Sequence, residues 1–172
     1  MNAPASRRRT LAALSAGCMV GLAAPAQAET PRIVGWIEPV TLSGGQLALE
    51  AKLDTGADVS SLDARDIRSF ERDGRSWVSF AVPDRKGRRL RLERPLERMM
   101  EIKKGSGATQ DRPVVQLKIC LDGVERLTSV NLVDRKHLST PMLLGRSFLE
   151  GHFAVDSART NTTSPACGAA SR

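Results

Sequence analysis

The sequence predicts an all-β domain. Apolar residues recur at every second position in several short runs, which is typical of strands with one buried face. Turn signals such as Asp73-Gly74 and Asp122-Gly123 separate these runs. Helical periodicity is almost absent, and many short strands at regular spacing favour a barrel-like domain. The length of 172 residues fits one such domain plus processing segments.

Residues 1–28 have the features of a secretory signal peptide. Three arginines at positions 7–9 precede an apolar run at positions 11–24, and Ala26-Gln27-Ala28 is a small-residue cleavage site. The apolar run is too short to span a bilayer permanently. We therefore expect export to the periplasm or the medium, by the general or the twin-arginine route, with cleavage after Ala28 and no stable membrane span. Lipidation at Cys18 is the minor alternative.

The first predicted strand covers residues 32–42 and ends at the turn Ser43-Gly44-Gly45. The second covers residues 46–53. Its apolar positions alternate with polar ones, and they are Leu47, Leu49, Ala51 and Leu53. This period of two specifies a half-buried strand. Asp54 follows directly after the end of this strand.

The later elements are likewise short apolar runs separated by turn signals. In order, they are a strand at 77–82, one or two strands between 90 and 100, a hairpin of 114–121 with 124–133, a short strand entering the turn Leu143-Leu144-Gly145, a helical turn at 146–150 and a strand at 153–155. We therefore place the domain at residues 29–157. Residues 158–172 form a polar tail, either disordered or in contact with a dimer partner.

The charge of the chain is moderately basic. Without the leader the formal net charge falls from +7 to +4, because three arginines leave and no acidic residue does. With few aromatic residues to stack on bases, this charge does not predict nucleic-acid binding. One stretch is crowded with basic residues, namely Arg85, Lys86, Arg88, Arg89, Arg91, Arg94 and Arg98. It is either a solvated hairpin or an electropositive wall for an acidic substrate.

Two stretches carry a resemblance to a known family. Leu53-Asp54-Thr55-Gly56-Ala57-Asp58 and the stretch 143–149 are similar to the two signature stretches of retroviral-type aspartic proteases, the retropepsins. The chain also resembles a bacterial family of retropepsin-like peptidases often labelled "ATP-dependent zinc proteases". That likeness runs through positions 35–36, 51–57, 73–78, 112–115, 132–135, 142–147 and 153–156. It covers nearly the whole predicted domain.

The resemblance implies a closed all-β barrel with one lobe per chain, a symmetric dimer and a flap hairpin over the cleft. We place the flap among the hairpins between residues 73 and 111. By the same resemblance, Asp58 and Arg146 would form a partly buried, bidentate pair that contacts the substrate backbone. The bacterial relatives often carry a basic residue where this chain has Asp58.

The chemistry implied for Asp54 requires two carboxylates about 3 Å apart that share one proton. One carboxylate activates a water, and the other protonates the developing oxyanion. The chain has one Asp-Thr-Gly, so a complete site needs a homodimer in which each chain supplies Asp54. Thr55 can bond across the two-fold axis, the Gly56 amide can bond the carboxylate, and Ala57 can line the cleft floor.

No metal or other cofactor is expected. The sequence has no His-Glu-x-x-His and no phosphate loop, and the part after the leader has two histidines, His137 and His152. Two cysteines, Cys120 and Cys167, follow the leader. A bridge within the chain, a bridge between subunits and two free thiols all remain open.

Three functions are compatible with these features. The leading hypothesis is an exported, homodimeric aspartic endopeptidase that hydrolyses peptide bonds. The alternative is a non-catalytic envelope module on the same fold, in which the basic hairpin holds an acidic partner. A third is the trimming of acidic tails, by analogy with the bacterial relatives' association with glutamate-adding enzymes.

Overall fold

The computed structural model describes residues 30–84, 86–103, 107–164 and 167. Its elements are β1 (Arg32–Leu42), β2 (Leu47–Leu53), β3 (Ser60–Asp63), β4 (Arg65–Arg72), β5 (Arg75–Pro83), β6 (Arg89–Lys103), β7 (Thr109–Leu121), β8 (Val124–Val133), β9 (Met142–Leu144), α1 (Arg146–Leu149) and β10 (Phe153–Thr160). The all-β prediction is confirmed. The predicted signal peptide lies outside the described residues.

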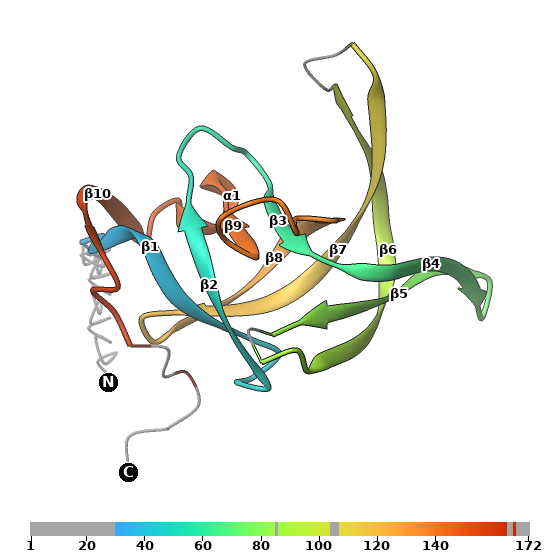
Figure 1. Ribbon diagram of the computed structural model, residues 1–172, viewed down its shortest axis with the longest axis horizontal. Coiled ribbons are helices and arrows are strands. Elements are labelled where there is room, and N and C mark those ends of the chain that lie inside the picture. The colour runs from blue at the N-terminus through green and yellow to red at the C-terminus, as the bar shows by residue number, and fades with distance from the viewer. Residues whose placement is uncertain (1–29, 85, 104–106, 165–166, 168–172) are drawn as a thin grey trace, which may run out of the picture.

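The strands form one mixed sheet in the order β10-β1-β2-β9-β3-β8-β7-β6-β5-β4 (Figure 1). Strand β1 also pairs with β7, through Thr41–Cys120 and Leu42–Ile119. Six strands, β1, β2, β9, β3, β8 and β7, therefore close in a ring. Strands β6, β5 and β4 extend from this ring as antiparallel hairpins.

Most of the core is made by the buried apolar positions of the ring strands, and β5 and β6 add Val78, Phe80, Val82 and Leu92. Along β2, Leu47, Leu49, Ala51 and Leu53 are buried and the residues between them are more exposed, as the alternation predicts. The short helix α1 adds Phe148, whose ring stacks on Phe153 of β10 at 5.8 Å between centroids. The predicted helical turn is therefore present, and it closes one end of the core.

The predicted hairpins are also present. Asp73-Gly74 and Asp122-Gly123 have positive φ at both residues, which is the backbone that a two-residue hairpin requires. Between residues 90 and 100 there is one strand, β6, with a register shift between Leu96 and Arg98.

Two strands were not predicted, β3 and β4. All four residues of β3 are buried although three of them are polar, because their side chains find partners inside the fold. Strand β4 has two apolar residues, Ile67 and Phe70, and is otherwise charged or polar. Neither strand shows the apolar alternation by which the others were found.

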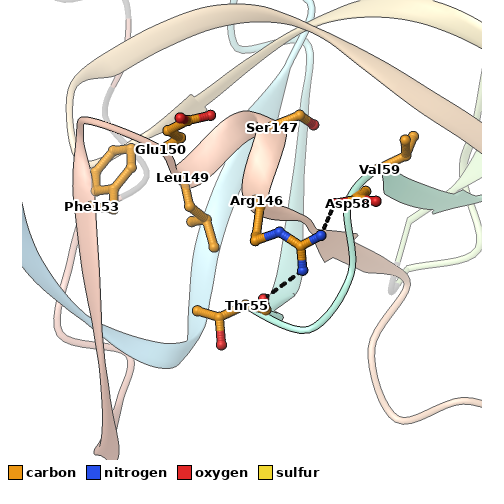
Figure 2. Close-up of a pocket in the computed structure, with 8 residues that line it drawn as sticks. All are labelled: Thr55, Asp58, Val59, Arg146, Ser147, Leu149, Glu150 and Phe153. Carbon is orange, nitrogen blue, oxygen red and sulfur yellow. Dashed lines mark hydrogen bonds and ion pairs between the residues drawn. The ribbon is translucent and has the colours of Figure 1, made fainter.

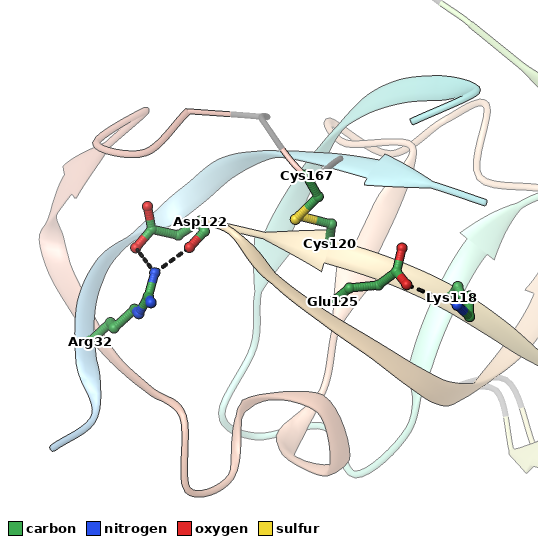
Figure 3. The surroundings of a disulfide bond; sticks show 6 residues. All are labelled: Arg32, Lys118, Cys120, Asp122, Glu125 and Cys167. Atoms are coloured by element: carbon green, nitrogen blue, oxygen red, sulfur yellow. Dashed lines mark hydrogen bonds and ion pairs between the residues drawn. A yellow bond between two sulfur atoms is a disulfide. The ribbon is translucent and has the colours of Figure 1, made fainter. Parts of the chain in front are cut away.

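The C-terminal segment runs along β1 well beyond the predicted domain end at residue 157. Strand β10 pairs in parallel with β1 and continues to Thr160. Thr162 and Thr163 then bond the buried carboxylate of Glu38. A disulfide joins Cys167 to Cys120 on β7, beside the β1–β7 pairing (Figure 3). Of the possibilities left open by the sequence, the structure has the bridge within the chain.

Within the part of the chain that the structure describes, no helix is long and apolar enough to cross a membrane.

Candidate active site

Asp54 stands at the end of β2, where the chain leaves the ring. Its backbone N–H donates to the Leu144 carbonyl at 2.8 Å, which extends the β2–β9 ladder by one bond. The Gly56 N–H donates to Asp54 Oδ1 at 3.0 Å, so the loop bonds its own carboxylate. A Cβ at Gly56 would lie 3.2 Å from that oxygen, and the position therefore favours glycine.

The second signature turn locks this loop in place. Gly145 packs directly on the loop backbone, because a Cβ there would lie 2.8 Å from the Asp58 carbonyl oxygen and 2.9 Å from that of Ala57. The Arg146 N–H donates to Ala57 O at 2.8 Å, and the Ser147 N–H donates to Asp58 O at 3.1 Å. The two stretches are about 90 residues apart in sequence and bonded backbone to backbone in the fold.

Arg146 reaches back over the loop (Figure 2). One guanidinium nitrogen forms an ion pair with Asp58, and another donates to the Thr55 carbonyl at 3.1 Å. The expected pairing is present, and its partly buried, bidentate character in a dimer stays a prediction. The side chains of Arg146 and Asp58 are 50% and 78% exposed, and the guanidinium divides its donors between two residues. A cavity of about 630 Å³ lies beside the pair, bordered also by Leu149 and Phe153.

All nine site residues predicted from the sequence thus meet at one end of the ring: Asp54, Thr55, Gly56, Ala57, Asp58, Leu143, Leu144, Gly145 and Arg146. Leu144 is buried in the core, whereas Thr55 is exposed in the single chain. The role expected of the Thr55 hydroxyl requires a second copy of the chain.

A groove of about 620 Å³ runs from this loop to the β6–β7 hairpin. The loop side includes Ala57, Asp58 and Leu143, and the hairpin side includes Met100 and Ile102. Of the hairpins between residues 73 and 111, this one faces the loop after Asp54 across a groove, and it therefore best fits the expected flap. Figure 1 shows β6 and β7 rising together away from the ring.

Three arginines line the same groove: Arg98, Arg112 and Arg135. Arg135 is buried and donates to Ser61 Oγ at 2.7 Å and to the Thr140 carbonyl at 3.2 Å. Burial, with a contribution from neighbouring Arg112, lowers the pKa of Arg135 against the opposing effect of Asp63 and Asp54. An arginine remains cationic despite such a shift, so the groove is electropositive.

Comparison with known proteins agrees with this geometry. A family model described as "Retropepsin-like aspartic endopeptidase RimB" matches residues 33–165. The chain belongs to this RimB-like family. The likeness to retropepsins inferred from the sequence is thereby confirmed.

Other relatives of this RimB-like chain include both structures and sequences. A crystal structure of a Legionella pneumophila protein of unknown function superposes with a TM-score of 0.69 at 38% identity, covering 78% of this chain and all of that one. A probable alpha-L-glutamate ligase of Desulfotalea psychrophila is 36% identical over 114 residues, which are 64% of this chain and 25% of the relative. Another from Parasynechococcus marenigrum is 34% identical over 128 residues, 72% and 28% of the two chains. The chain spans about a quarter of the length of these ligases.

Three residues at or near the candidate site were not predicted from the sequence, and the first is Lys52. Lys52 Nζ lies 3.4 Å from Asp54 Oδ2, so the second carboxylate oxygen faces an ammonium group. The signal that identifies it is the alternation of β2, which puts residues 52 and 54 on the same side of the strand. Arg112 and Arg135 were also missed, because their positions in the chain do not indicate that they meet in the groove.

The basic stretch, expected to be either a solvated hairpin or an electropositive wall, is largely paired with acids. Arg88 bonds Asp84 at 2.6 Å, Arg89 lies 3.4 Å from Asp66, and Arg98 pairs with Glu97. Arg98 is the member of this stretch that also borders the groove. Arg85 lies outside the described residues.

Among the residues that the structure describes, no group of three or more histidine, cysteine or acidic side chains is placed to hold a metal ion. His137 is exposed in the loop after β8, and the His152 ring lies against Phe153 at 6.4 Å.

Proposed function

We propose that this chain is an aspartic endopeptidase that works as a homodimer, with Asp54 of each copy forming the catalytic dyad. One carboxylate activates a water for attack on the scissile carbonyl, and the other protonates the developing oxyanion. The geometry of the catalytic loop carries the proposal. Asp54 lies at a strand end with one oxygen bonded to Gly56, in a loop held by the Gly145 turn.

The single chain supplies one half of the proposed dyad site. The Asp54 side chain is 28% exposed and Thr55 is exposed, so both are accessible to a second copy. The Asp58–Arg146 pair is also largely exposed. A partner chain that covered this end of the ring would bury these groups together and complete the dyad.

Export of the enzyme is supported by two features. The leader has a basic start, an apolar run and a cleavage site. The Cys120–Cys167 bridge is of the kind that persists in oxidising compartments such as the periplasm. Cell fractionation followed by N-terminal sequencing tests this part of the proposal. A mature chain in the periplasm or medium that begins at Glu29 supports it, and an uncleaved cytoplasmic chain contradicts it.

A peptide with acidic residues is the substrate that fits the groove best. Arg98, Arg112 and Arg135 line it, and guanidinium groups bind carboxylates through paired hydrogen bonds. The relatives named as probable alpha-L-glutamate ligases point to the same chemical class. Matched peptides that contain glutamate or glutamine test the preference. A kcat/KM at least about tenfold higher for the glutamate peptides supports it, and equal values contradict it.

The alternative is a non-catalytic module that holds an acidic partner with its basic hairpin. The ion pairs of that hairpin with its own acids weaken this alternative, because a paired arginine offers less to a partner. The groove, by contrast, is bordered by the loop that follows Asp54, and its Arg135 interacts electrostatically with that carboxylate.

The deciding experiment is Asp54→Asn. The variant should fold and dimerise like the wild type but lose peptide cleavage by at least about a thousandfold, because the dyad cannot operate without its shared proton. Wild-type activity should decline towards alkaline pH and be blocked by a statine-type transition-state mimic. Asp134→Asn, at an exposed acid in the loop after β8, is the matched control and should retain activity. Cleavage by Asp54→Asn at the wild-type rate would refute the proposal.

A further inference from the structure

The contact between Lys52 and Asp54 is unusual for a carboxylate that must meet its own copy. Asp54 Oδ1 accepts from the Gly56 amide, and Oδ2 lies 3.4 Å from Lys52 Nζ. Each oxygen of the candidate catalytic group is therefore held by a different partner. The amide comes from the loop that follows Asp54, and the ammonium comes from the strand that precedes it.

The pairing of the strands places Lys52 on the face of the sheet that lines the groove. Lys52 is opposite Leu143 in the β2–β9 ladder, and Leu143 is opposite Ser61 in the β9–β3 ladder. Residues opposite each other in a ladder point to the same side of the sheet. Leu143 and Ser61 both line the groove, so the Lys52 stem lies on the groove side. Its 42% exposure leaves the side chain accessible at the end of the ring.

A second copy of Asp54 would bring a like charge to this position. Two ionised carboxylates in contact repel each other. When they share one proton the dyad still keeps one negative charge, and burying that charge in a water-poor interface opposes association. The other charges near Asp54 are Arg135, which interacts with it electrostatically, Asp58 on the same loop, and Glu50 on the same face of β2. Among the residues that the structure describes, Lys52 forms an ion pair with this carboxylate, at 3.4 Å.

We propose that Lys52 is a positioning residue for the composite site. Its ammonium compensates the charge of Asp54 in its own chain, so that two chains can bring their carboxylates together at neutral pH. It also fixes the orientation of Oδ2 while Gly56 fixes Oδ1. The inference rests on the proposed homodimer and adds what allows that homodimer to form.

The test is a double-mutant cycle on dimer affinity, measured by analytical ultracentrifugation at neutral pH and low salt. Lys52→Met in the wild-type background should raise the dimer Kd at least about tenfold, because the negative charge of the dyad is no longer compensated. In the Asp54→Asn background the same change should leave the Kd within about twofold, since the charge to be compensated is gone. Lys52→Arg should restore the wild-type Kd.

Lys118→Met is the matched control. Lys118 is also a strand lysine paired with one carboxylate, that of Glu125 at 2.9 Å, but it lies on β7 outside the groove-lining residues. Its loss should leave the dimer Kd unchanged. Lys52→Gln keeps a polar side chain and should behave like Lys52→Met, which separates charge from packing. Circular dichroism and a thermal melt establish that each variant is folded.

The outcomes separate this proposal from the function on which it rests. An unchanged Kd for folded Lys52→Met, or an equal loss in both Asp54 backgrounds, would overturn the role of Lys52 while the dimeric peptidase stands. A wild-type chain that remains monomeric even with a bound transition-state mimic would contradict the dimeric peptidase itself, and the role of Lys52 with it.

Discussion

Glu38 is the buried group whose replacement has the clearest expected cost. Its side chain is fully buried in β1, and it accepts five hydrogen bonds. Oε1 takes the N–H of Gly35 at 2.7 Å and both the N–H and the hydroxyl of Thr162, at 2.9 and 2.5 Å. Oε2 takes the N–H and the hydroxyl of Thr163, at 3.0 and 2.9 Å. One carboxylate thus holds the segment after β10 against the ring.

Glu38→Gln keeps the shape and removes the charge. The amide NH₂ that replaces one oxygen cannot accept, so at least one buried N–H loses its acceptor and the remaining bonds lose charge assistance. Hydrogen bonds to charged groups contribute about 1.5–3 kcal/mol, so we expect a loss of about 2–3 kcal/mol in the free energy of unfolding. In urea this corresponds to a midpoint lower by about 1–2 M at an unchanged m value.

Acidification should reproduce part of this effect. Burial by itself raises the pKa of Glu38, but the hydrogen bonds from Thr162 and Thr163 together outweigh it and hold the pKa below the ordinary value of 4.5. A pKa that is lower in the folded chain than in the unfolded one gives stability that is complete above pH 4.5 and is lost as the pH falls through the folded value. The difference between the wild type and Glu38→Gln should therefore shrink at acidic pH.

Glu125→Gln is the control, because Glu125 is exposed and makes one ion pair, with Lys118. Exposed pairs contribute about 0–1 kcal/mol, so its urea midpoint should stay near that of the wild type. Equal, small shifts for Glu38→Gln and Glu125→Gln would refute the assignment of Glu38 as the group that holds the C-terminal segment.

Two more predictions concern the disulfide and the second signature turn. Cys120→Ser, or reduction of the wild type, should lower the free energy of unfolding by about 2–4 kcal/mol, because the bridge closes a loop with a sequence separation of 47. Urea unfolding with and without reductant measures this loss. An unfolding curve that reductant does not change would contradict the prediction. Gly145→Ala should reduce peptidase activity at least about tenfold, because its Cβ would lie 2.8 Å from the Asp58 carbonyl oxygen and displace the loop that carries Asp54. The measurement is kcat/KM, with Ser147→Ala as the control. Equal kcat/KM values for the two variants would contradict the prediction.

The sequence was informative where local pattern and motif coincide. The alternation in β2 and the turns at Asp73-Gly74 and Asp122-Gly123 depend on neighbouring residues, and each is present as predicted. The site loop was also predictable, because its motifs reflect a close backbone contact that requires glycine at position 145 and a tight fit that favours it at position 56. These features require no knowledge of distant contacts.

Features that depend on distant partners were not predictable. Strand β3 is buried although it is mostly polar, since Ser60, Ser61 and Asp63 bond groups about 70 to 85 positions away. Arg135 reads as an ordinary loop residue until the fold brings it to the groove. The choice of flap hairpin likewise depends on which hairpin faces the loop, and that is set by the order of strands in the sheet.

A crystal structure of the wild-type dimer would test the central claim most directly, through the distance between the two Asp54 carboxyl groups. We predict that their inner oxygens lie about 3 Å apart across a two-fold axis, close enough to share one proton. A native dimer in which the two carboxyl groups face away from each other would contradict the account.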